Sequence, residues 1–199
     1  MVDLTLGHWT RALFVKQPDL YLPFFEELKE RGVREARGVA RLFRREGVGP
    51  GSRLLDLGCG IGRHAVPLAR LGYEIVGLDL SLRYLDLARR YARAQGVARR
   101  TQFVRGDFRN LASTLKSLGP FDGIHSGWTS IGYYGRLVDR KALAAVRRST
   151  RPGGLLVLWL TNKDWVLQHF QARSWSRTGG TVLLEDRSFD RRSSFLRSR

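Results

Sequence analysis

The stretch LLDLGCGIGR, residues 54–63, decides the fold that we expect of this 199-residue chain. It opens with an apolar run typical of a buried strand, which carries one acid, Asp56. Glycines then alternate at Gly58, Gly60 and Gly62, so the backbone can turn tightly and approach a ligand without side-chain clashes. A helix follows, and the free N–H groups at its start favour an anionic ligand. We therefore expect a strand, a ligand-binding loop and a helix in this order.

Other glycine-loop classes fit these residues less well. The dinucleotide fingerprint G-x-G-x-x-G, started at Gly58, places Arg63 where a third glycine permits close packing of helix on strand. A phosphate-binding P-loop needs Gly-Lys-Ser/Thr after the loop, and none follows. A loop that only turns the chain is a third alternative, which the preceding strand and Asp56 disfavour.

Strand-like and helical patterns alternate along the chain, as is typical of a parallel α/β sheet. The apolar runs of strand length are residues 53–57, 74–78, 101–104, 121–126 and 155–160. We expect a doubly wound, mostly parallel seven-stranded sheet whose last two strands, residues 181–186 and 194–197, form an antiparallel pair. Such sheets bind ligands at the carboxyl ends of their strands.

The chain is expected to form a single domain with an N-terminal addition. Residues 23–46 carry apolar side chains at helical spacing. We expect residues 1–46 to supply a lid and this helix, packed on a core domain of residues 47–199.

The chain is strongly basic. It has 35 Lys+Arg, of which 30 are Arg, against 18 Asp+Glu, and its formal net charge is +17. This charge permits a nucleic-acid partner, since arginine is a good phosphate ligand, although genome base composition also favours arginine. A stripe of arginines on the helix expected over residues 23–46 is interpreted as a solvent-exposed face. The alternative is a row of arginines that binds nucleic-acid phosphates. The stripe is Arg34, Arg37, Arg41 and Arg45, interleaved with Glu30, Glu35 and Glu46.

The single cysteine, Cys59, excludes an intrachain disulfide framework and a Cys-rich zinc site. We expect no metal site. The reducing cytoplasm is the simplest location, because residues 1–14 lack a signal-peptide core. We expect no membrane partner, because no apolar run approaches the roughly 18 residues of a membrane helix.

Two further acids follow expected strands. Asp79 ends the second strand, where it would face the ligand crevice and could accept two hydrogen bonds from a ribose diol. Alternatively, Asp79 could be the N-cap of the next helix. After the third strand come Gly106 and Asp107, and Asp107 could accept from an adenine amino group while Phe108 packs on the ring. The alternative for Asp107 is a turn residue.

Together these segments resemble class I S-adenosylmethionine-dependent methyltransferases. The resemblance covers residues 48–160 and includes FDGI at 121–124 and RPGG at 151–154, in the family's order. It implies a Rossmann-like methyltransferase fold and an enzyme that binds S-adenosylmethionine, transfers the methyl group by in-line displacement and releases S-adenosylhomocysteine. The donor-binding residues it implies are Asp56, Gly58, Cys59, Gly60, Gly62, Asp79, Leu80, Gly106, Asp107, Phe108 and Ser126.

Within that family the chain is similar to uncharacterised small-molecule-type enzymes. It shares with them Gly62-Arg63-His64, Thr129-Ser130 and the run NKDW at 162–165. Those enzymes tend to continue beyond the end of this chain, and the last expected strand is short and polar. We therefore expect a C-terminal truncation.

The acceptor pocket is expected after the fourth strand. Residues 126–134 combine hydroxyls, glycines and aromatic rings, as small-molecule pockets require, and residues 9–21 could close over them as a lid. Strand alternation predicts that His125 and Ser126 point to opposite faces. The acceptor-pocket candidates, each of which could instead be a packing residue, are His125, Trp128, Thr129, Tyr133 and Tyr134.

Three functions follow, and the first is the main prediction: a methyltransferase acting on a small-molecule acceptor. The second is an RNA methyltransferase that uses the basic surface. Residues 126–129 read SGWT, without the Pro-Pro-aromatic run of base-amino enzymes or the nucleophilic cysteine of cytosine-C5 enzymes. The third is a non-catalytic S-adenosylmethionine-binding or regulatory protein.

Overall fold

The computed structural model describes residues 9–128, 130–178 and 180–198. Its contacts divide the chain into two compact units, Met1–Trp159 and Leu160–Arg199. Among the described residues, no helix is long and apolar enough to cross a membrane.

A five-stranded parallel sheet forms the centre of the first unit, with strand order β3-β2-β1-β4-β5. Its strands are β1 (Arg53–Leu57), β2 (Glu74–Asp79), β3 (Thr101–Arg105), β4 (Phe121–Ser126) and β5 (Thr150–Leu158). β1 pairs with β2 on one side and with β4 on the other, so the strand order reverses between β1 and β4. This reversal is the switch point at which doubly wound sheets bind ligands. The expected doubly wound α/β fold is confirmed.

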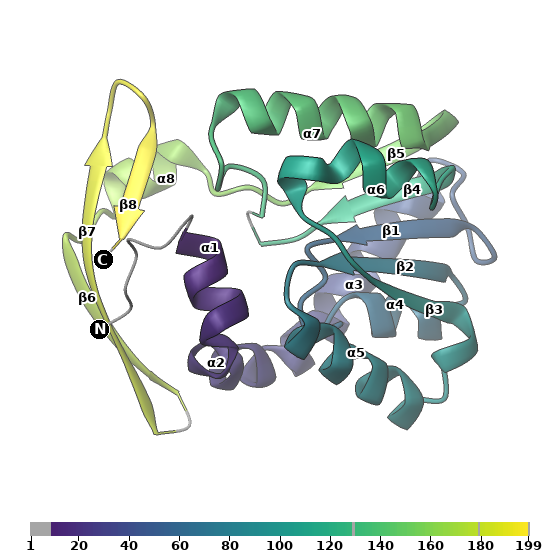
Figure 1. Ribbon diagram of the computed structural model, residues 1–199, viewed down its shortest axis with the longest axis horizontal. Coiled ribbons are helices and arrows are strands. Elements are labelled where there is room, and N and C mark those ends of the chain that lie inside the picture. The colour runs from purple at the N-terminus through teal and green to yellow at the C-terminus, as the bar shows by residue number, and fades with distance from the viewer. Residues whose placement is uncertain (1–8, 129, 179, 199) are drawn as a thin grey trace. The chain divides into compact units, whose positions relative to one another are not determined.

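Helices cover both faces of this sheet (Figure 1). One face carries α3 (Lys29–Arg45), α4 (Ala65–Arg70) and α5 (Leu82–Ala94), and the other carries α6 (Leu111–Lys116) and α7 (Arg136–Ser149). Side chains of β1 alternate between the faces: Leu54 belongs to the cluster with α3 and α4, whereas Leu55 and Leu57 belong to the cluster with α6 and α7. The same alternation turns Asp56 toward the α3 and α4 side.

Short elements precede α3 and connect the later strands. They are α1 (Trp9–Arg11), the π-helix η1 (Ala12–Lys16), the 3-10 helices η2 (Pro18–Leu20), η3 (Ala98–Arg100) and η4 (Phe108–Asn110), and α2 (Leu22–Glu27). The single helix expected over residues 23–46 is therefore two helices, α2 and α3, which meet at Leu28. The N-cap of α5 is Ser81, because its hydroxyl accepts a hydrogen bond from the Tyr84 N–H at the start of that helix.

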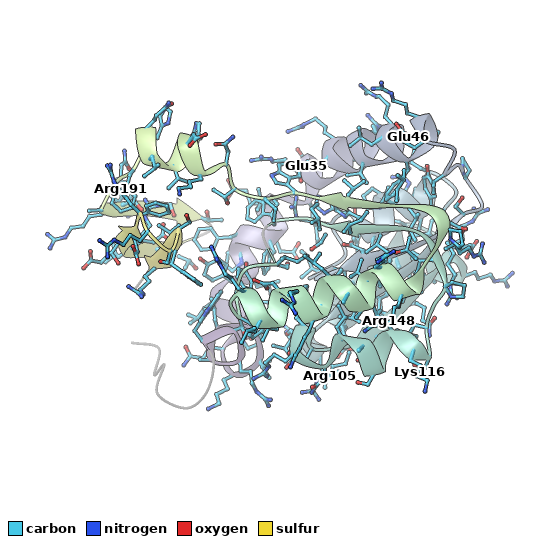
Figure 2. The ribbon with its side chains drawn as sticks, turned by 90° about the horizontal axis from the view of Figure 1, so that it is seen from above. Glu35, Glu46, Arg105, Lys116, Arg148 and Arg191 are labelled. Atoms are coloured by element: carbon cyan, nitrogen blue, oxygen red, sulfur yellow. The ribbon has the colours of Figure 1, made fainter. Side chains whose placement is uncertain are left out.

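The arginine stripe of α3 is exposed along its whole length, as are Glu30 and Glu46. Further exposed basic side chains project elsewhere from the first unit, among them Arg105, Lys116 and Arg148 (Figure 2).

The acid Glu35 does not belong to this solvated face, and that expectation was wrong. Its side chain is only 8% exposed and turns inward. The reason is Gly32, one helical turn earlier, where an added Cβ would lie 2.6 Å from the Arg63 carbonyl oxygen. A glycine at that position lets α3 approach the backbone that follows the glycine loop, which brings Glu35 to Arg63.

The second unit holds α8 (Lys163–Gln168) and a separate antiparallel sheet, ordered β6-β7-β8. Its strands are β6 (Arg173–Thr178), β7 (Thr181–Asp190) and β8 (Phe195–Ser198). The expected continuous seven-stranded sheet was therefore wrong, although both expected last strands exist as β7 and β8. β6 was not expected, since RSWSRT has one apolar residue in six and no alternation. Pairing with β7, where Trp175 lies opposite Leu184, makes it a strand.

Candidate active site

A pocket lies in the first unit where β1, β2 and β4 end. Its cavity volume is about 140 Å³. One wall comes from the glycine loop after β1 and from the residues that follow β2, and we call it the loop wall. The other comes from rings of residues 14–25 and of the segment after β4, and we call it the aromatic wall. The position agrees with the rule for doubly wound sheets.

Backbone geometry defines the loop wall. Gly58 and Gly60 have φ angles of +82° and +53°, a region that favours glycine. The N–H groups of Gly58 and Cys59 donate to the Leu78 carbonyl at 2.8 and 3.0 Å, which ties the loop to β2. An added Cβ at Gly60 would meet nothing within 4 Å, whereas one at Gly58 would lie 2.5 Å from the Ser130 hydroxyl. Gly60 therefore presents bare backbone to open space.

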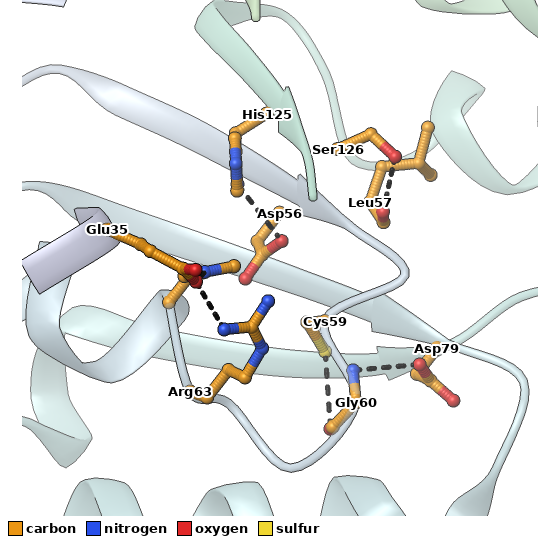
Figure 3. A network of polar contacts seen from close by, with 10 residues as sticks. Glu35, Asp56, Leu57, Cys59, Gly60, Arg63, Asp79, His125 and Ser126 are labelled. Carbon is orange, nitrogen blue, oxygen red and sulfur yellow. Dashed lines mark hydrogen bonds and ion pairs between the residues drawn. The ribbon is translucent and has the colours of Figure 1, made fainter. Parts of the chain in front are cut away.

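Asp79 joins the end of β2 to the glycine loop. Its Oδ2 accepts a hydrogen bond from the Gly60 N–H at 2.8 Å (Figure 3). Its Oδ1 accepts one from the Ser81 N–H at 2.9 Å. Each carboxylate oxygen keeps a further lone pair, so Asp79 can also accept from a ligand hydroxyl. Burial raises the pKa of Asp79 to about 6, against the opposite effect of these hydrogen bonds. At neutral pH the carboxylate is therefore mostly ionised.

Three more residues predicted for the donor line the same pocket: Cys59, Leu80 and Phe108. Cys59 is 5% exposed, and burial raises the pKa of its thiol well above the usual value. The neutral thiol therefore contributes shape rather than charge to the pocket.

Five residues predicted for the donor site do not line this pocket: Asp56, Gly62, Gly106, Asp107 and Ser126. Gly62 has packing neighbours instead, since an added Cβ would lie 3.1 Å from the Ala88 Cβ on α5. Gly106 is also tightly packed, because an added Cβ would lie 2.7 Å from the Leu78 side chain. Ser126 donates through its hydroxyl to the Leu57 carbonyl at 3.0 Å.

Asp107 begins η4 as an N-cap. Its carboxylate accepts from the Arg109 N–H at 2.9 Å and pairs with the Arg109 guanidinium, with Nη2 and Oδ2 2.5 Å apart. These hydrogen bonds hold the pKa of Asp107 below its usual value despite partial burial. The adenine role of Asp107 stays a prediction.

The aromatic wall contains Trp128, Tyr133 and Tyr134 of the expected acceptor segment. Thr129 lies outside the described residues, and His125 does not line the pocket. The Trp128 backbone has a φ of +58°, which is strained for a residue other than glycine, and such strain collects at functional sites. The centre of the Trp128 ring lies 4.7 Å from the Arg63 guanidinium carbon.

The N-terminal segment packs against this wall. The rings of Trp9 and Tyr133 have centroids 4.7 Å apart, and the Thr10 and Tyr134 hydroxyls are 2.9 Å apart and hydrogen-bonded. Phe14, which lines the pocket, stacks on Tyr133 with centroids 6.5 Å apart. The segment that was expected as a lid thus lies in contact with the predicted acceptor residues.

A buried group of charged side chains adjoins the pocket (Figure 3). The Arg63 guanidinium donates through Nη1 to Glu35 Oε2, and His64 Nε2 lies 2.8 Å from the same oxygen. Burial would raise the pKa of Glu35, but these two hydrogen bonds outweigh it and bring it to about 2. Burial lowers the pKa of His64. Glu35 is therefore an ionised carboxylate that accepts hydrogen bonds from the His64 imidazole and from the Arg63 guanidinium.

His125 and Asp56 continue this group below the pocket. They are register partners on β4 and β1, and Nδ1 of His125 is 3.5 Å from Oδ1 of Asp56. The His125 ring also meets the His64 ring, with centroids 5.0 Å apart. The Ser126 hydroxyl instead donates to the Leu57 carbonyl, so the side chains of His125 and Ser126 contact different residues.

Sequence reasoning missed several of these residues. Glu35 was taken as solvated, and the rings of Phe14, Tyr21 and Phe25 were not assigned to the pocket individually. The helix-interior glycine Gly32 is the signal for Glu35, because a glycine inside a helix often marks a close approach of backbone.

Comparison with known proteins identifies the family of the chain. A profile described as a methyltransferase domain matches residues 54–154. The ubiquinone biosynthesis O-methyltransferase of Cereibacter sphaeroides (strain KD131 / KCTC 12085) is 34% identical over 117 residues, which are 57% of this chain and 43% of that protein. The tRNA 5-carboxymethoxyuridine methyltransferase of Escherichia coli (strain K12) is 32% identical over 121 residues, 59% of this chain and 43% of that protein.

Among solved structures, the CcbJ methyltransferase of Streptomyces caelestis is 24% identical with a TM-score of 0.67, over 84% of this chain and 64% of that one. At this identity the likeness shows the fold.

The sheet order and the loop with its acid define a Rossmann-like methyltransferase fold. Because the profile matches half of the chain, the chain belongs to the family of S-adenosylmethionine-dependent methyltransferases. The match covers less than half the length of either curated relative.

Proposed function

We propose that this chain transfers the methyl group of S-adenosylmethionine to a small-molecule acceptor in the pocket of the first unit. The observation that carries the proposal is the pairing, in one pocket, of a bare glycine-loop wall next to Asp79 with a wall of aromatic rings. Small-molecule pockets combine apolar walls with a few placed polar groups in this way.

The loop wall would hold the donor. Asp79 would accept hydrogen bonds from the ribose hydroxyls, and the bare backbone at Gly60 would let the donor approach closely. The glycine loop supports this assignment because its N–H groups at Gly58 and Cys59 are already fixed by Leu78. The loop is therefore organised before a ligand arrives, which lowers the entropic cost of binding.

The aromatic wall would hold the acceptor. The donor supplies a methyl group already activated by its sulfonium, so the chain must mainly align an acceptor atom behind that group. Rings such as Trp128 and Tyr133 offer apolar contact and faces that attract a cationic methyl group. The contacts of Trp9 and Thr10 with this wall would help to exclude water from it.

Methyl transfer from labelled S-adenosylmethionine tests the proposal. The chain is incubated with fractionated metabolites and, separately, with total RNA, and label is followed into each pool. We expect label in a small-molecule fraction, and none with Gly60→Val as the matched control. Binding of the donor with no transfer into either pool would favour a non-catalytic donor-binding protein.

RNA is the second candidate acceptor, favoured by the net charge of +17 and by the tRNA methyltransferase among the relatives. The exposed stripe Arg34, Arg37, Arg41 and Arg45 could contact phosphates. If the charge is generic, RNA should bind weakly and lose affinity steeply with salt, vanishing near physiological ionic strength. Submicromolar, structure-selective binding at that salt, measured by filter retention, would favour RNA as the acceptor.

A further inference from the structure

Three side chains of the kind that bind metal ions converge beside the pocket. Asp56 comes from β1, His125 from β4 and His64 from the residue before α4. One ligand atom from each lies within 4.8 Å of the others. Asp56 and His125 meet because they are register partners on adjacent parallel strands. This meeting is fixed by the sheet, not by flexible loops.

Several polar atoms of this group are buried without a hydrogen-bond partner. Among the described residues these include Oδ2 of Asp56 and both ring nitrogens of His125. Asp56 is 2% exposed and His125 is 1% exposed, so solvent does not satisfy these atoms. Buried unpaired polar atoms are costly and rare in folded proteins, and a bound ion is one of the few explanations for a cluster of them.

His64 is held in the orientation that a metal ligand needs. Its Nε2 is 2.8 Å from Glu35 Oε2, and an ionised carboxylate can only accept, so Nε2 donates. Metal-binding histidines almost always donate their other ring N–H to a carboxylate or carbonyl in this manner. With Nε2 directed at Glu35, Nδ1 is the ring nitrogen of His64 that would bind a metal ion.

Charge around the group is compatible with a cation. The carboxylates of Asp56 and Glu35 face one fixed positive group, the Arg63 guanidinium, which is itself paired with Glu35. Two carboxylates therefore oppose a single arginine.

A path into the group runs through the pocket. Both His64 and Gly127 line the pocket. An added Cβ at Gly127 would lie 2.8 Å from Cε1 of His64 and 3.0 Å from Cε1 of His125. A side chain at Gly127 would collide with both imidazoles, so this glycine lets the pocket lining pack directly against the two rings.

We propose that Asp56, His64 and His125 bind a divalent transition-metal ion of the Zn²⁺ class, with one coordination position left toward the pocket. Two imidazoles and a carboxylate are donors that suit Zn²⁺, and three protein ligands with an open fourth position are typical of catalytic rather than structural zinc. The proposal departs from the expectation of no metal site. Each ligand comes from a different element, so no local spacing in the sequence signals the site. Binding of this ion does not depend on the proposed methyl transfer, although the site adjoins the same pocket.

Direct metal titration tests this proposal. The whole chain is stripped with a chelator and titrated with Zn²⁺ against a chromophoric competitor, and Co²⁺ is added in a parallel sample. We expect one ion per chain and visible absorption bands from bound Co²⁺. Glu35→Gln should weaken Zn²⁺ binding by about 10- to 100-fold, the usual cost of losing the carboxylate behind a metal-binding histidine. His125→Asn and His64→Asn, which remove ligands, should weaken it more.

The control is His169→Ala, because His169 is exposed and stacks on Trp165 in the second unit. This variant should bind Zn²⁺ as the parent chain does. Circular dichroism monitors folding, and if His125→Asn does not fold, His64→Asn and the Co²⁺ spectrum of the parent chain decide. Failure of the parent chain to bind one Zn²⁺ at micromolar free metal would overturn the proposal. Equal affinity of the parent chain and a folded ligand variant would overturn it too.

Discussion

The two walls of the pocket are built by different means. The loop wall comes from neighbouring segments, and its shape is set by the positive φ angles of Gly58 and Gly60 and by hydrogen bonds to Leu78 and Asp79. The aromatic wall joins residues far apart in the sequence, such as Trp9 and Tyr133, through contacts between side chains. Donor binding should therefore respond most to changes of backbone and charge, and acceptor handling to loss of rings.

The largest effect is expected at Gly60. In Gly60→Val a branched side chain would occupy the open space over the loop, and the φ of +53° would be strained. We expect donor affinity to fall by at least about 100-fold, which corresponds to roughly 2.7 kcal/mol, while the chain stays folded. Calorimetric titration with S-adenosylmethionine measures the affinity, and circular dichroism the fold.

Gly96→Val is the matched control for this change. Gly96 also has a positive φ, of +70°, with nothing within 4 Å of an added Cβ, and it follows α5 away from the pocket lining. This variant should lose stability and keep its donor affinity. Equal donor affinity in Gly60→Val and the parent chain would mean that the loop is only structural.

A smaller but still large effect is expected at Asp79. Asp79→Ala should weaken donor binding by about tenfold or more, because hydrogen bonds to a charged group contribute roughly 1.5–3 kcal/mol. Asp86→Ala removes an exposed carboxylate of α5 that pairs with Arg89, and it should change donor affinity little. Parallel calorimetric titrations compare the two. An unaltered dissociation constant for Asp79→Ala would place the ribose elsewhere.

The aromatic wall is tested by deleting rings. Trp128→Ala and Tyr133→Ala should reduce methyl transfer more than they weaken donor binding, because both rings line the predicted acceptor side. The loss of rate should be about 10- to 100-fold, as expected when a reacting group is misplaced by about an ångström. Trp165→Ala, at an exposed tryptophan of the second unit, is the control. Rates and donor affinities that fall in step would remove the distinction between the two walls.

The smallest effect concerns pH and Asp79. Burial raises the pKa of this carboxyl in the folded chain to about 6, from 3.8. A group with a raised folded pKa binds its proton more tightly when folded, so its stabilising contribution is complete at low pH and is lost as pH rises through about 6. The stability of the parent chain relative to Asp79→Asn should therefore fall between about pH 4 and pH 6.5. Urea unfolding of both proteins at these two pH values measures the difference in their free energies of unfolding. A difference that does not change with pH would contradict the raised pKa.

Local patterns in the sequence predicted the loop wall and most strands of the first unit. The run from residue 54 to Gly62 specifies a strand and a turn with φ angles that favour glycine, and β4 was located at its observed bounds, Phe121–Ser126. β6 was missed because its polar residues carry no alternation, and pairing with β7 alone makes it a strand.

Long-range contacts of the site escaped the same reasoning. Glu35 has the spacing of a solvated helix face, and only the approach of α3 to Arg63, permitted by Gly32, turns it inward. The contact of Asp56 with His125 depends on the register of β1 against β4. Register and helix approach are set by packing of the whole unit, so no single segment of sequence encodes them.

A crystal structure of the chain with S-adenosylhomocysteine tests the division between the two walls most directly. Our account predicts that the ribose hydroxyls lie within hydrogen-bonding distance of Asp79, and that the sulfur faces the aromatic wall at Trp128 and Tyr133. A complex in which both rings lie buried away from the sulfur, or in which the ribose does not meet Asp79, would contradict it.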